Sequence, residues 1–458
     1  MVSIIKYITP ALAVTCLSNI AFAVNAQSLS IDKYYQAEQQ LSKHTDKLVT
    51  GTLDHPVWTN NSQLTYRSHT KQGEAFFIID AVTKEKDLAF DHQKLATALS
   101  ASTKQDIKAE KLPFTSFDLI NNQTISIKIK DDLYQCDIER YSCDQVKNTA
   151  KDNELVAPNG LHAVYIQDNN LWLRKLSDNS KKQLTTDGED NFGYATNNAG
   201  WIRGKKPVVK WSPDSKKLIT FKHDGRNVGE MGIVSTAVGH PNIDVWKYPL
   251  PGDENIFKIH RVVIDVEQAK VIPLDMPADD HRSTITDHVA GRDGQLLDID
   301  WSADSSHFAF VSSTRDHKTA TLKIANAKTG KVRTIFSETE DSFFESGVSD
   351  ISWQYLDKSN EIIWFSQRSD WGHLYLVDAT TGKIKNQITQ GDWTVLELLD
   401  VNQDTGKLIF TGAGKEGGDP YFHYLYSINK DGSGLTLLTP EKKSHRISFS
   451  KNAEYFLD

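Results

Sequence analysis

The chain has 458 residues, of which 39% are hydrophobic and 24% are charged, and these proportions are typical of a soluble globular protein. The formal net charge of -8 at pH 7 gives no basic surface and excludes the nucleic-acid-binding classes. The Trp, Phe and Tyr residues are spread along nearly the whole sequence, which excludes a disordered chain.

Residues 1–26 have the features of a signal peptide. Lys6 supplies a positive charge, an apolar stretch follows from Tyr7 to Val24, and two small-residue cleavage sites, Ala-Phe-Ala and Val-Asn-Ala, end the segment. An uncleaved membrane anchor is the alternative, but the stretch is short and interrupted by polar residues, whereas a span needs about 20 apolar residues. The sequence therefore predicts a periplasmic or secreted protein without a membrane span after removal of the signal peptide.

Residues 27–50 predict an N-terminal helical segment. Ser30 is in position to cap a helix. Apolar residues follow near helical spacing, at Tyr34, Ala37, Leu41 and Leu48. This is the single stretch that we expect to be helical. After it, short alternating strands separated by turn residues continue, so residues 51–458 are expected to form one all-β domain.

Two cysteines remain after the signal peptide, at Cys136 and Cys143. If Glu139 and Arg140 form a tight turn, the cysteines fall directly opposite each other on neighbouring strands, with Cβ atoms roughly 4.5–5.5 Å apart. That separation permits a disulfide after a slight adjustment, and an oxidising compartment favours one. Two buried free thiols are the alternative.

A recurring phrase marks repeated units along the chain. Trp-Ser-Pro-Asp-Ser at 211–215 returns as Trp-Ser-Ala-Asp-Ser at 301–305, each time followed by an apolar strand. A second hairpin follows in these units, with Gly in turns such as 328–331 and 380–383, where a positive φ is needed. A period of roughly 40–50 residues with four strands per unit is typical of propeller blades. Two unrelated β-sandwiches, the alternative, do not explain the repeated phrase.

The spacing predicts a β-propeller of about eight four-stranded blades. About seven units run from Trp58 to Pro440, and an eighth begins at Ser448. One unit is longer than the others and carries an insertion around residues 231–253. Because the last blade would be incomplete, we expect exposed strand edges at residues 445–458 and in the earliest strands.

The chain encodes no recognisable catalytic motif. Gly-x-Ser-x-Gly, His-Glu-x-x-His, Cys-x-x-Cys and the P-loop motif are all absent from the sequence. The His residues are dispersed without ligand spacing, and carboxylates such as Asp214 and Asp304 fall in turns, where Asp accepts backbone hydrogen bonds. We therefore expect no catalytic residue, no metal site and no cofactor in this chain.

Several longer strings carry a more specific resemblance. They are Gln-Leu-Thr-Thr-Asp-Gly from 183, Val-Trp-Lys-Tyr-Pro-Leu-Pro-Gly-Asp-Glu-Asn-Ile from 245, Ser-Gln-Arg-Ser-Asp-Trp-Gly-His from 366 and Asp-Pro-Tyr-Phe-His-Tyr-Leu-Tyr from 419. Together they resemble the N-terminal β-propeller of bacterial dipeptidyl peptidase IV-like serine peptidases, members of the prolyl oligopeptidase family. The resemblance implies an eight-bladed propeller that gates and binds peptides for a C-terminal α/β hydrolase holding a Ser-Asp-His triad. That hydrolase is not encoded in these residues, so we expect the chain to be inactive alone.

The resemblance also suggests where a peptide substrate would bind. The dipeptidyl peptidases carry paired glutamates shortly after the Leu-Thr-Thr-Asp-Gly phrase, whereas this chain has no Glu-Glu there, so strict dipeptidyl specificity is not expected. The residues that follow the phrase are candidates to line the substrate side of the pore: Tyr194, Asn197, Asn198, Trp201 and Arg203. An ordinary long hairpin loop is the alternative.

Two functions from different classes fit the sequence. The first is the non-catalytic propeller of an exported serine peptidase, with a peptide substrate, a hydrolase domain and a homodimeric copy as its expected partners. The second is a stand-alone periplasmic TolB-like propeller that binds a protein or peptide ligand. The DNA immediately downstream separates them, because a Gly-x-Ser-x-Gly hydrolase encoded there supports the first and a terminator supports the second.

Overall fold

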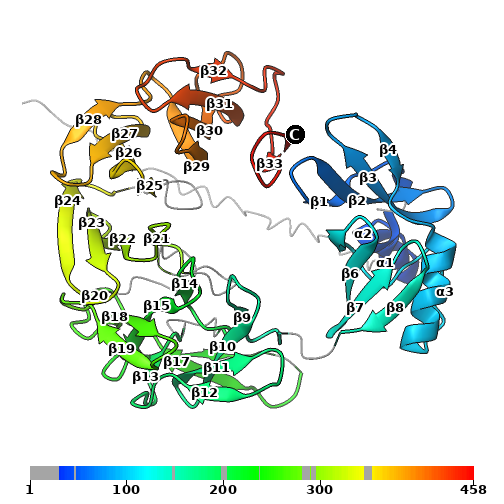
Figure 1. Ribbon diagram of the computed structural model, residues 1–458, viewed down its shortest axis with the longest axis horizontal. Helices are drawn as coiled ribbons and strands as arrows, with labels where there is room; N and C mark the ends of the chain where they lie inside the picture. Colours follow the sequence, from blue (N-terminus) through cyan, green and yellow to red (C-terminus); the bar gives the residue numbers. More distant parts are fainter. Residues whose placement is uncertain are drawn as a thin grey trace, which may run out of the picture.

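The computed structural model describes residues 30–45, 48–146, 150–196, 204–236, 238–280, 289, 296–344 and 353–458. In this part of the chain, antiparallel sheets follow one another around a central opening, as the blades of a propeller do (Figure 1). In most of these sheets the first strand lies nearest the opening, and the later strands lie progressively further out (Figure 1). The all-β propeller expected from the sequence is confirmed.

Seven sheets of four or more strands, named blades 1 to 7 in chain order, make up the ring of described residues. Blade 1 contains β1 (Asp54–Trp58), β2 (Gln63–Thr70), β3 (Gly73–Asp80) and β4 (Lys86–Leu88). Blade 2 contains β5 (Asp118–Asn121), β6 (Thr124–Ile129), β7 (Asp132–Asp137) and β8 (Ser142–Gln145). Blade 3 contains β9 (Leu155–Val156), β10 (His162–Gln167), β11 (Asn170–Lys175) and β12 (Lys181–Gln183). Blade 4 contains β13 (Phe192–Tyr194), β14 (Lys210–Trp211), β15 (Lys217–Asp224), β18 (Lys258–Asp265), β19 (Lys270–Pro273) and β20 (Asp279–Asp280).

Blades 5 to 7 repeat the four-stranded order without interruption. Blade 5 contains β21 (Ile299–Trp301), β22 (His307–Ser313), β23 (Thr319–Asn326) and β24 (Val332–Thr339). Blade 6 contains β25 (Trp353–Leu356), β26 (Glu361–Ser366), β27 (His373–Asp378) and β28 (Ile384–Gln387). Blade 7 contains β29 (Thr394–Asn402), β30 (Lys407–Ala413), β31 (Tyr424–Asn429) and β32 (Thr436–Leu437). The insertion expected around 231–253 is a hairpin of β16 (Glu230–Val234) and β17 (Ile243–Lys247), which project from blade 4 and pair with each other.

The expectation of about eight four-stranded blades is wrong for the described residues. The eighth unit is a closing hairpin of two short strands, β33 (Ser448–Phe449) and β34 (Phe456–Leu457), because a tight turn occupies the residues between them. The hairpin reaches blade 1 through the Trp58 indole, whose Nε1 donates a hydrogen bond to the Ser448 carbonyl at 3.1 Å. The first and last units therefore meet in the ring (Figure 1).

The helices also differ from the expectation. The described residues contain three, α1 (Ile31–Glu38), α2 (Ser42–Thr45) and α3 (His92–Thr103), so the N-terminal stretch forms two short helices and α3 is an additional one. The side chain of Asp91 caps α3 by accepting from the Lys94 N–H. The helix α3 falls between β4 and β5 in the sequence, and only three of its residues are buried. The helical spacing of its apolar residues is therefore a weak signal in the sequence.

Neighbouring blades share their cores. One cluster joins Ile219, Phe221 and Val263 of blade 4 to Phe308 and Phe310 of blade 5. Since a middle blade has a neighbour on both sides, its central strands are buried on both faces, as in β26, where every residue is buried. The sequence of such a strand is therefore apolar without the polar–apolar alternation of a half-exposed sheet.

The repeated Trp-Ser-x-Asp-Ser phrase builds the turn between the first and second strands of a blade. The Ser212 hydroxyl donates to Asp214 Oδ1 at 2.6 Å, and the Ser302 hydroxyl donates to Asp304 Oδ1 at 2.7 Å. The hydrogen bonds from serine hydroxyls and a backbone N–H lower the pKa of Asp304 to about 2, so its carboxylate is ionised. The role of these carboxylates as turn residues is confirmed.

The same turns also connect successive blades. The Asn159 N–H of blade 3 donates to Ser215 Oγ of blade 4 at 3.1 Å, and the Asp214 N–H of blade 4 donates to Ser305 Oγ of blade 5 at 3.1 Å. The last serine of the phrase therefore holds the preceding blade. The repeated serine therefore has two structural roles, one in the blade turn to which it belongs and one in the hydrogen bond to the preceding blade.

Glycine in the turn between the third and fourth strands lets two blades approach closely. Gly330 and Gly382 have φ of 73° and 69°, as the sequence predicts. A Cβ added at Gly330 would lie 2.2 Å from the carbonyl oxygen of Pro273, and one at Gly382 would lie 2.1 Å from that of Ile335. Both carbonyls belong to the outer strand of the preceding blade, so glycine is required for packing as well as for φ.

The ring has two different faces, because its strands alternate in direction. Turns between strands one and two, and between strands three and four, lie on one face, named the turn face. Hairpins between strands two and three, and the links between blades, lie on the other, named the connection face. The β16–β17 hairpin joins β15 to β18, the second and third strands of blade 4, and therefore leaves from the connection face.

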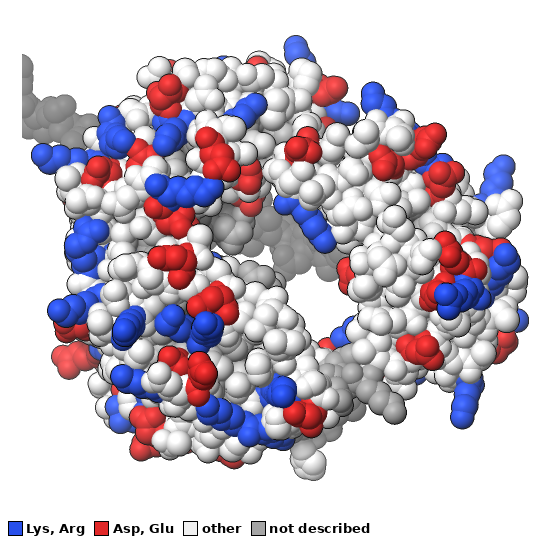
Figure 2. Space-filling model, in the orientation of Figure 1, with Lys and Arg blue, Asp and Glu red and all other residues white. Residues whose placement is uncertain are grey.

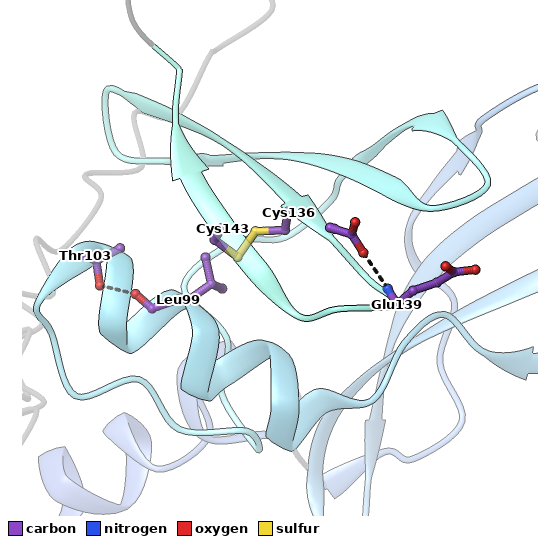
Figure 3. The surroundings of a disulfide bond; sticks show 6 residues. Leu99, Thr103, Cys136, Glu139 and Cys143 are labelled. Carbon is purple, nitrogen blue, oxygen red and sulfur yellow. Dashed lines mark hydrogen bonds between the residues drawn. A yellow bond between two sulfur atoms is a disulfide. The ribbon is translucent and has the colours of Figure 1, made fainter.

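The predicted disulfide is confirmed in blade 2. Cys136 of β7 lies directly opposite Cys143 of β8, and the two sulfur atoms are bonded. The Asp137 carboxylate accepts the N–H groups of Glu139 and Arg140, which forms the expected turn. Figure 3 shows that the bond lies beside α3, so the disulfide and the helix pack together in the core of this blade.

Charged residues of both signs are interspersed over the ring in the view of Figure 2. No large area of that view carries one sign, in keeping with the net charge of -8. Among the described residues, none of the helices is long and apolar enough to cross a membrane.

Candidate functional site

The inner strand of blade 4 is interrupted by a loop. β13 and β14 both pair with β15, and residues 197–203 between these two strands lie outside the described part of the chain. The Ala195 N–H donates to the Phe221 carbonyl and the Val208 N–H donates to the Ala195 carbonyl, both at 2.9 Å, which closes the loop at its base. Residues 196–207 are named the inner loop. β14, which follows the inner loop, lies beside the central opening (Figure 1).

Only one of the five predicted substrate-binding residues lies in the described part of the chain. Asn197, Asn198, Trp201 and Arg203 fall outside the described residues. Tyr194 ends β13 at the base of the inner loop, where its side chain is buried. Its substrate-binding role stays a prediction, and its contacts show what the hydroxyl does in this structure.

The Tyr194 hydroxyl is held by a carboxylate. It donates a hydrogen bond to Asp187 Oδ1 at 2.8 Å. Burial raises the pKa of Tyr194, and the hydrogen bond to Asp187 raises it further, so the phenol remains a neutral donor. Tyr194 therefore fixes the base of the inner loop to the Leu-Thr-Thr-Asp-Gly phrase that precedes it.

A lysine from β15 completes this contact. Lys222 Nζ donates to the Asp187 carbonyl at 2.7 Å and to its Oδ2 at 2.8 Å. Burial acts to raise the pKa of Asp187, but the hydrogen bonds from Lys222 and Tyr194 outweigh it, so the pKa is lowered and the carboxylate is ionised. The base of the loop thus contains a buried lysine whose charge is balanced by an exposed aspartate.

Phe192 lies between two cations at this base. Its ring centroid is 4.0 Å from Lys222 Nζ and 4.0 Å from Arg226 Cζ, within the range of cation–π contacts. Arg226 is also bound to Asp224, with two nitrogen–oxygen distances of 3.0 and 2.7 Å. The aromatic ring and the two ion pairs pack together where β13 pairs with the end of β15, and this group of side chains is named the platform.

Two further carboxylates lie in the same segment without an ion-pair partner. Glu189 and Asp190 are exposed, and within the described residues neither forms an ion pair within 4.0 Å, although the charge of Glu189 contributes to raising the pKa of Arg226. Glu189 forms a backbone bridge with Phe192, which places both acids next to the platform. These side chains, with Lys222 and Phe192, were missed at the level of the sequence. A lysine inside the apolar run of β15 was the available signal.

One cluster of metal-binding residue types occurs in the described residues, at the end of the chain. The ligand atoms of Glu441, His445 and Asp458 lie within 4.8 Å of one another. Both ring nitrogens of His445 are already engaged, Nδ1 with Asp458 Oδ2 at 2.6 Å and Nε2 with the Glu441 carbonyl at 3.0 Å. The histidine thus ties the closing hairpin to the segment after blade 7.

The family model of the dipeptidyl peptidase IV N-terminal region matches residues 114–458. A curated relative, "Probable dipeptidyl-aminopeptidase B" of Aspergillus oryzae, is 26% identical over 332 residues, which cover 66% of this chain and 35% of the relative. A protein of the same name from Sclerotinia sclerotiorum is 21% identical over 465 residues, covering 94% of this chain and 49% of the relative. The chain thus spans between a third and half of the length of these relatives.

Two solved structures share the fold. A putative dipeptidyl aminopeptidase IV from Bacteroides ovatus superposes with a TM-score of 0.64 at 17% identity, covering 89% of this chain and 56% of that protein. Dipeptidyl peptidase 4 of Porphyromonas gingivalis superposes with a TM-score of 0.60 at 15% identity, covering 93% of this chain and 58% of that protein. With the family match over residues 114–458, these findings show that the chain belongs to the family of dipeptidyl peptidase IV N-terminal regions.

Proposed function

We propose that the chain is the non-catalytic propeller of an exported serine peptidase, and that an α/β hydrolase domain covers its connection face. In this role the ring admits peptides through its opening and holds them for cleavage. The observation that carries the proposal is a set of large exposed aromatic side chains on the connection face, together with an exposed apolar side of α1, in a chain of the dipeptidyl peptidase IV N-terminal family.

Large aromatic side chains project from three places on the connection face. Trp371 lies in the turn between β26 and β27 and is 41% exposed, and Tyr421 lies between β30 and β31 and is 84% exposed. Phe343 lies in the link that follows β24 and is 48% exposed. Aromatic residues are enriched where proteins meet one another, because they bury a large apolar area at a small entropic cost.

The first helix presents a second apolar surface. Ile31, Tyr34 and Tyr35 share one side of α1 by their helical spacing, all three are exposed, and no residue of the helix is buried. A helix of eight residues is not stable in water by itself, so it requires a partner surface. The hydrolase domain is the occupant that we propose, because the curated relatives are two to three times as long as the matched part of this chain.

The base of the inner loop supports peptide handling. A peptide with a free N-terminus carries an ammonium group, and an exposed carboxylate that is not held in a close ion pair binds such a group through charge-assisted hydrogen bonds. Glu189 and Asp190 meet this requirement on the connection-face side of blade 4, where β13 pairs with the end of β15. These two acids are adjacent in sequence but are not the Glu-Glu pair of the resembled enzymes, so a broader exopeptidase specificity is proposed.

The purified chain is expected to show no peptidase activity, because its residues encode no nucleophile elbow. The measurement is the release of p-nitroaniline from a set of Xaa-Pro p-nitroanilide substrates, with a serine-directed inhibitor as the control. Inhibitor-sensitive release by the chain alone would contradict the proposal. Sequencing the DNA after codon 458 then separates the two functions, since a hydrolase gene supports this role and a terminator favours the ligand-binding propeller.

A further inference from the structure

A basic cavity lies between blades 5 and 6, on the turn face. Its volume is about 480 Å³, and it is formed by the start of β22, the turn between β23 and β24, and the first turn of blade 6. Glu189 and Asp190 lie where β13 pairs with the end of β15, at the opposite end of the strands, so the cavity is separate from the proposed peptide site. Ile324 and Val332 form its apolar floor.

The charge of the cavity is positive. Lys331 and Arg333 line it, no Asp or Glu is among the described residues that do so, and neither cation lies within 4.0 Å of a described carboxylate. Arg333 donates to the carbonyls of Thr380 at 3.1 Å and Ala379 at 2.8 Å. These bonds fix the guanidinium against blade 6 without neutralising its charge.

Carboxylates near the cavity are occupied in turns. Asp304 accepts hydrogen bonds from the hydroxyls of Ser302 and Ser306, and Asp357 accepts from the Ala303 N–H at 2.6 Å. Their negative charge still reaches the cavity wall. Burial is the largest cause that raises the pKa of Tyr355, and the charge of Asp357 raises it further. These carboxylates are held in the turns and do not form ion pairs with the two cavity cations.

Neutral hydrogen-bonding groups surround the two cations. The Asn326 Nδ2 lies 3.3 Å from His307 Nε2, and the Tyr355 hydroxyl donates to Asn360 Oδ1 at 3.3 Å. The Asn360 amide also donates to Thr380 Oγ1 at 2.8 Å. These bonds orient the amides and rings at the rim, so the cavity has polar walls whose geometry is set before a ligand arrives.

We propose that this cavity binds a tetrahedral oxyanion, phosphate or sulfate, carried as a monoester of a small organic group. Arg333 would supply its charge and the N–H groups that do not bond to the two carbonyls, Lys331 a mobile point charge, and the two asparagines additional hydrogen bonds. The cavity is several times larger than the oxyanion itself, and its apolar floor suits the organic group. A free anion has the same headgroup chemistry, and binding measurements separate it from the ester.

The test is isothermal titration calorimetry of the whole chain with phenyl phosphate, inorganic phosphate and, as a neutral control, phenol. Binding of phenyl phosphate at one site is expected, with no binding of phenol. Tighter binding of phenyl phosphate than of inorganic phosphate assigns the site to a monoester, whereas equal affinity assigns it to the free anion. The absence of binding by both anions at millimolar concentration would overturn the proposal.

Two matched variants separate a built site from general surface charge. Lys331→Met is expected to weaken binding at least tenfold, and Lys383→Met is expected to leave it unchanged. Lys383 holds the equivalent place in the Thr-Thr-Gly-Lys turn of blade 6, is exposed and lies outside the cavity. Equal weakening by both variants would overturn the proposal, and equal thermal midpoints of the two proteins would exclude misfolding as the cause.

Discussion

Replacing Arg261 with methionine is expected to destabilise the ring by about 3–5 kcal/mol, the usual cost of removing one partner from a buried ion pair. Arg261 of β18 is 4% exposed. Its Nε donates to Asp279 at 2.7 Å and its Nη1 donates to Asp298 at 3.1 Å. Asp298 precedes β21, so the contact joins blade 4 to blade 5. Burial acts to lower the pKa of Arg261, but the two carboxylates raise it, and the charge is retained.

The matched control is Arg226→Met in the same blade. Arg226 also binds a carboxylate through two nitrogens, but its side chain is 49% exposed, so its loss is expected to destabilise the ring far less than the loss of Arg261. The measurement is the urea midpoint of tryptophan fluorescence for the two variants and the parent. Equal shifts for the two variants would show that burial of the Arg261 cluster adds nothing to the junction of blades 4 and 5.

Replacing Gly382 with alanine is expected to lower the free energy of unfolding by about 1–2 kcal/mol through the left-handed backbone, and by about 1–3 kcal/mol more through overpacking. The second cost arises because the new Cβ would lie 2.1 Å from the Ile335 carbonyl oxygen of blade 5. Backbone atoms cannot move away as a flexible side chain does, so blades 5 and 6 must separate. The loss is measured by urea unfolding and by hydrogen exchange of β24 and β28.

Gly160→Ala isolates the backbone effect. Gly160 has the same φ of +69° as Gly382, but an added Cβ there would meet no atom within 4 Å. The free energy of unfolding of Gly160→Ala is therefore expected to fall only by the cost of the left-handed backbone, without the cost of overpacking. If both variants unfolded at the same urea concentration, the close approach of the two blades at Gly382 would contribute nothing measurable.

The features that the sequence predicted depend on local periodicity. Cys136 and Cys143 face each other because the side-chain period of a strand is two and the turn between them is short. Asp214 and Asp304 occupy their turns because Asp hydrogen-bonds to nearby backbone N–H groups wherever the phrase occurs. Such relations are contained within about ten residues and need no knowledge of the neighbouring blade.

The features that were missed depend on contacts between units distant in sequence. Arg261 and Asp298 are 37 residues apart, and nothing in either segment identifies the other as its partner. The second role of Gly382 comes from the position of blade 5, which the turn itself does not encode. At the candidate site, Tyr194 was predicted from the resemblance. Lys222 was missed because its partner Asp187 lies 35 residues away, in the link between β12 and β13.

Hydrogen exchange tests the central claim most directly, by comparing the chain alone with the chain joined to the α/β hydrolase region of a family member. The account predicts slower exchange in the joined protein on the connection face and in the first helix, at residues 31–38, 341–344, 367–372 and 414–423. The turns at 212–217 and 302–307, on the opposite face, are expected to exchange at the same rate in both proteins. Protection of those turns, with the connection face unchanged, would contradict the account.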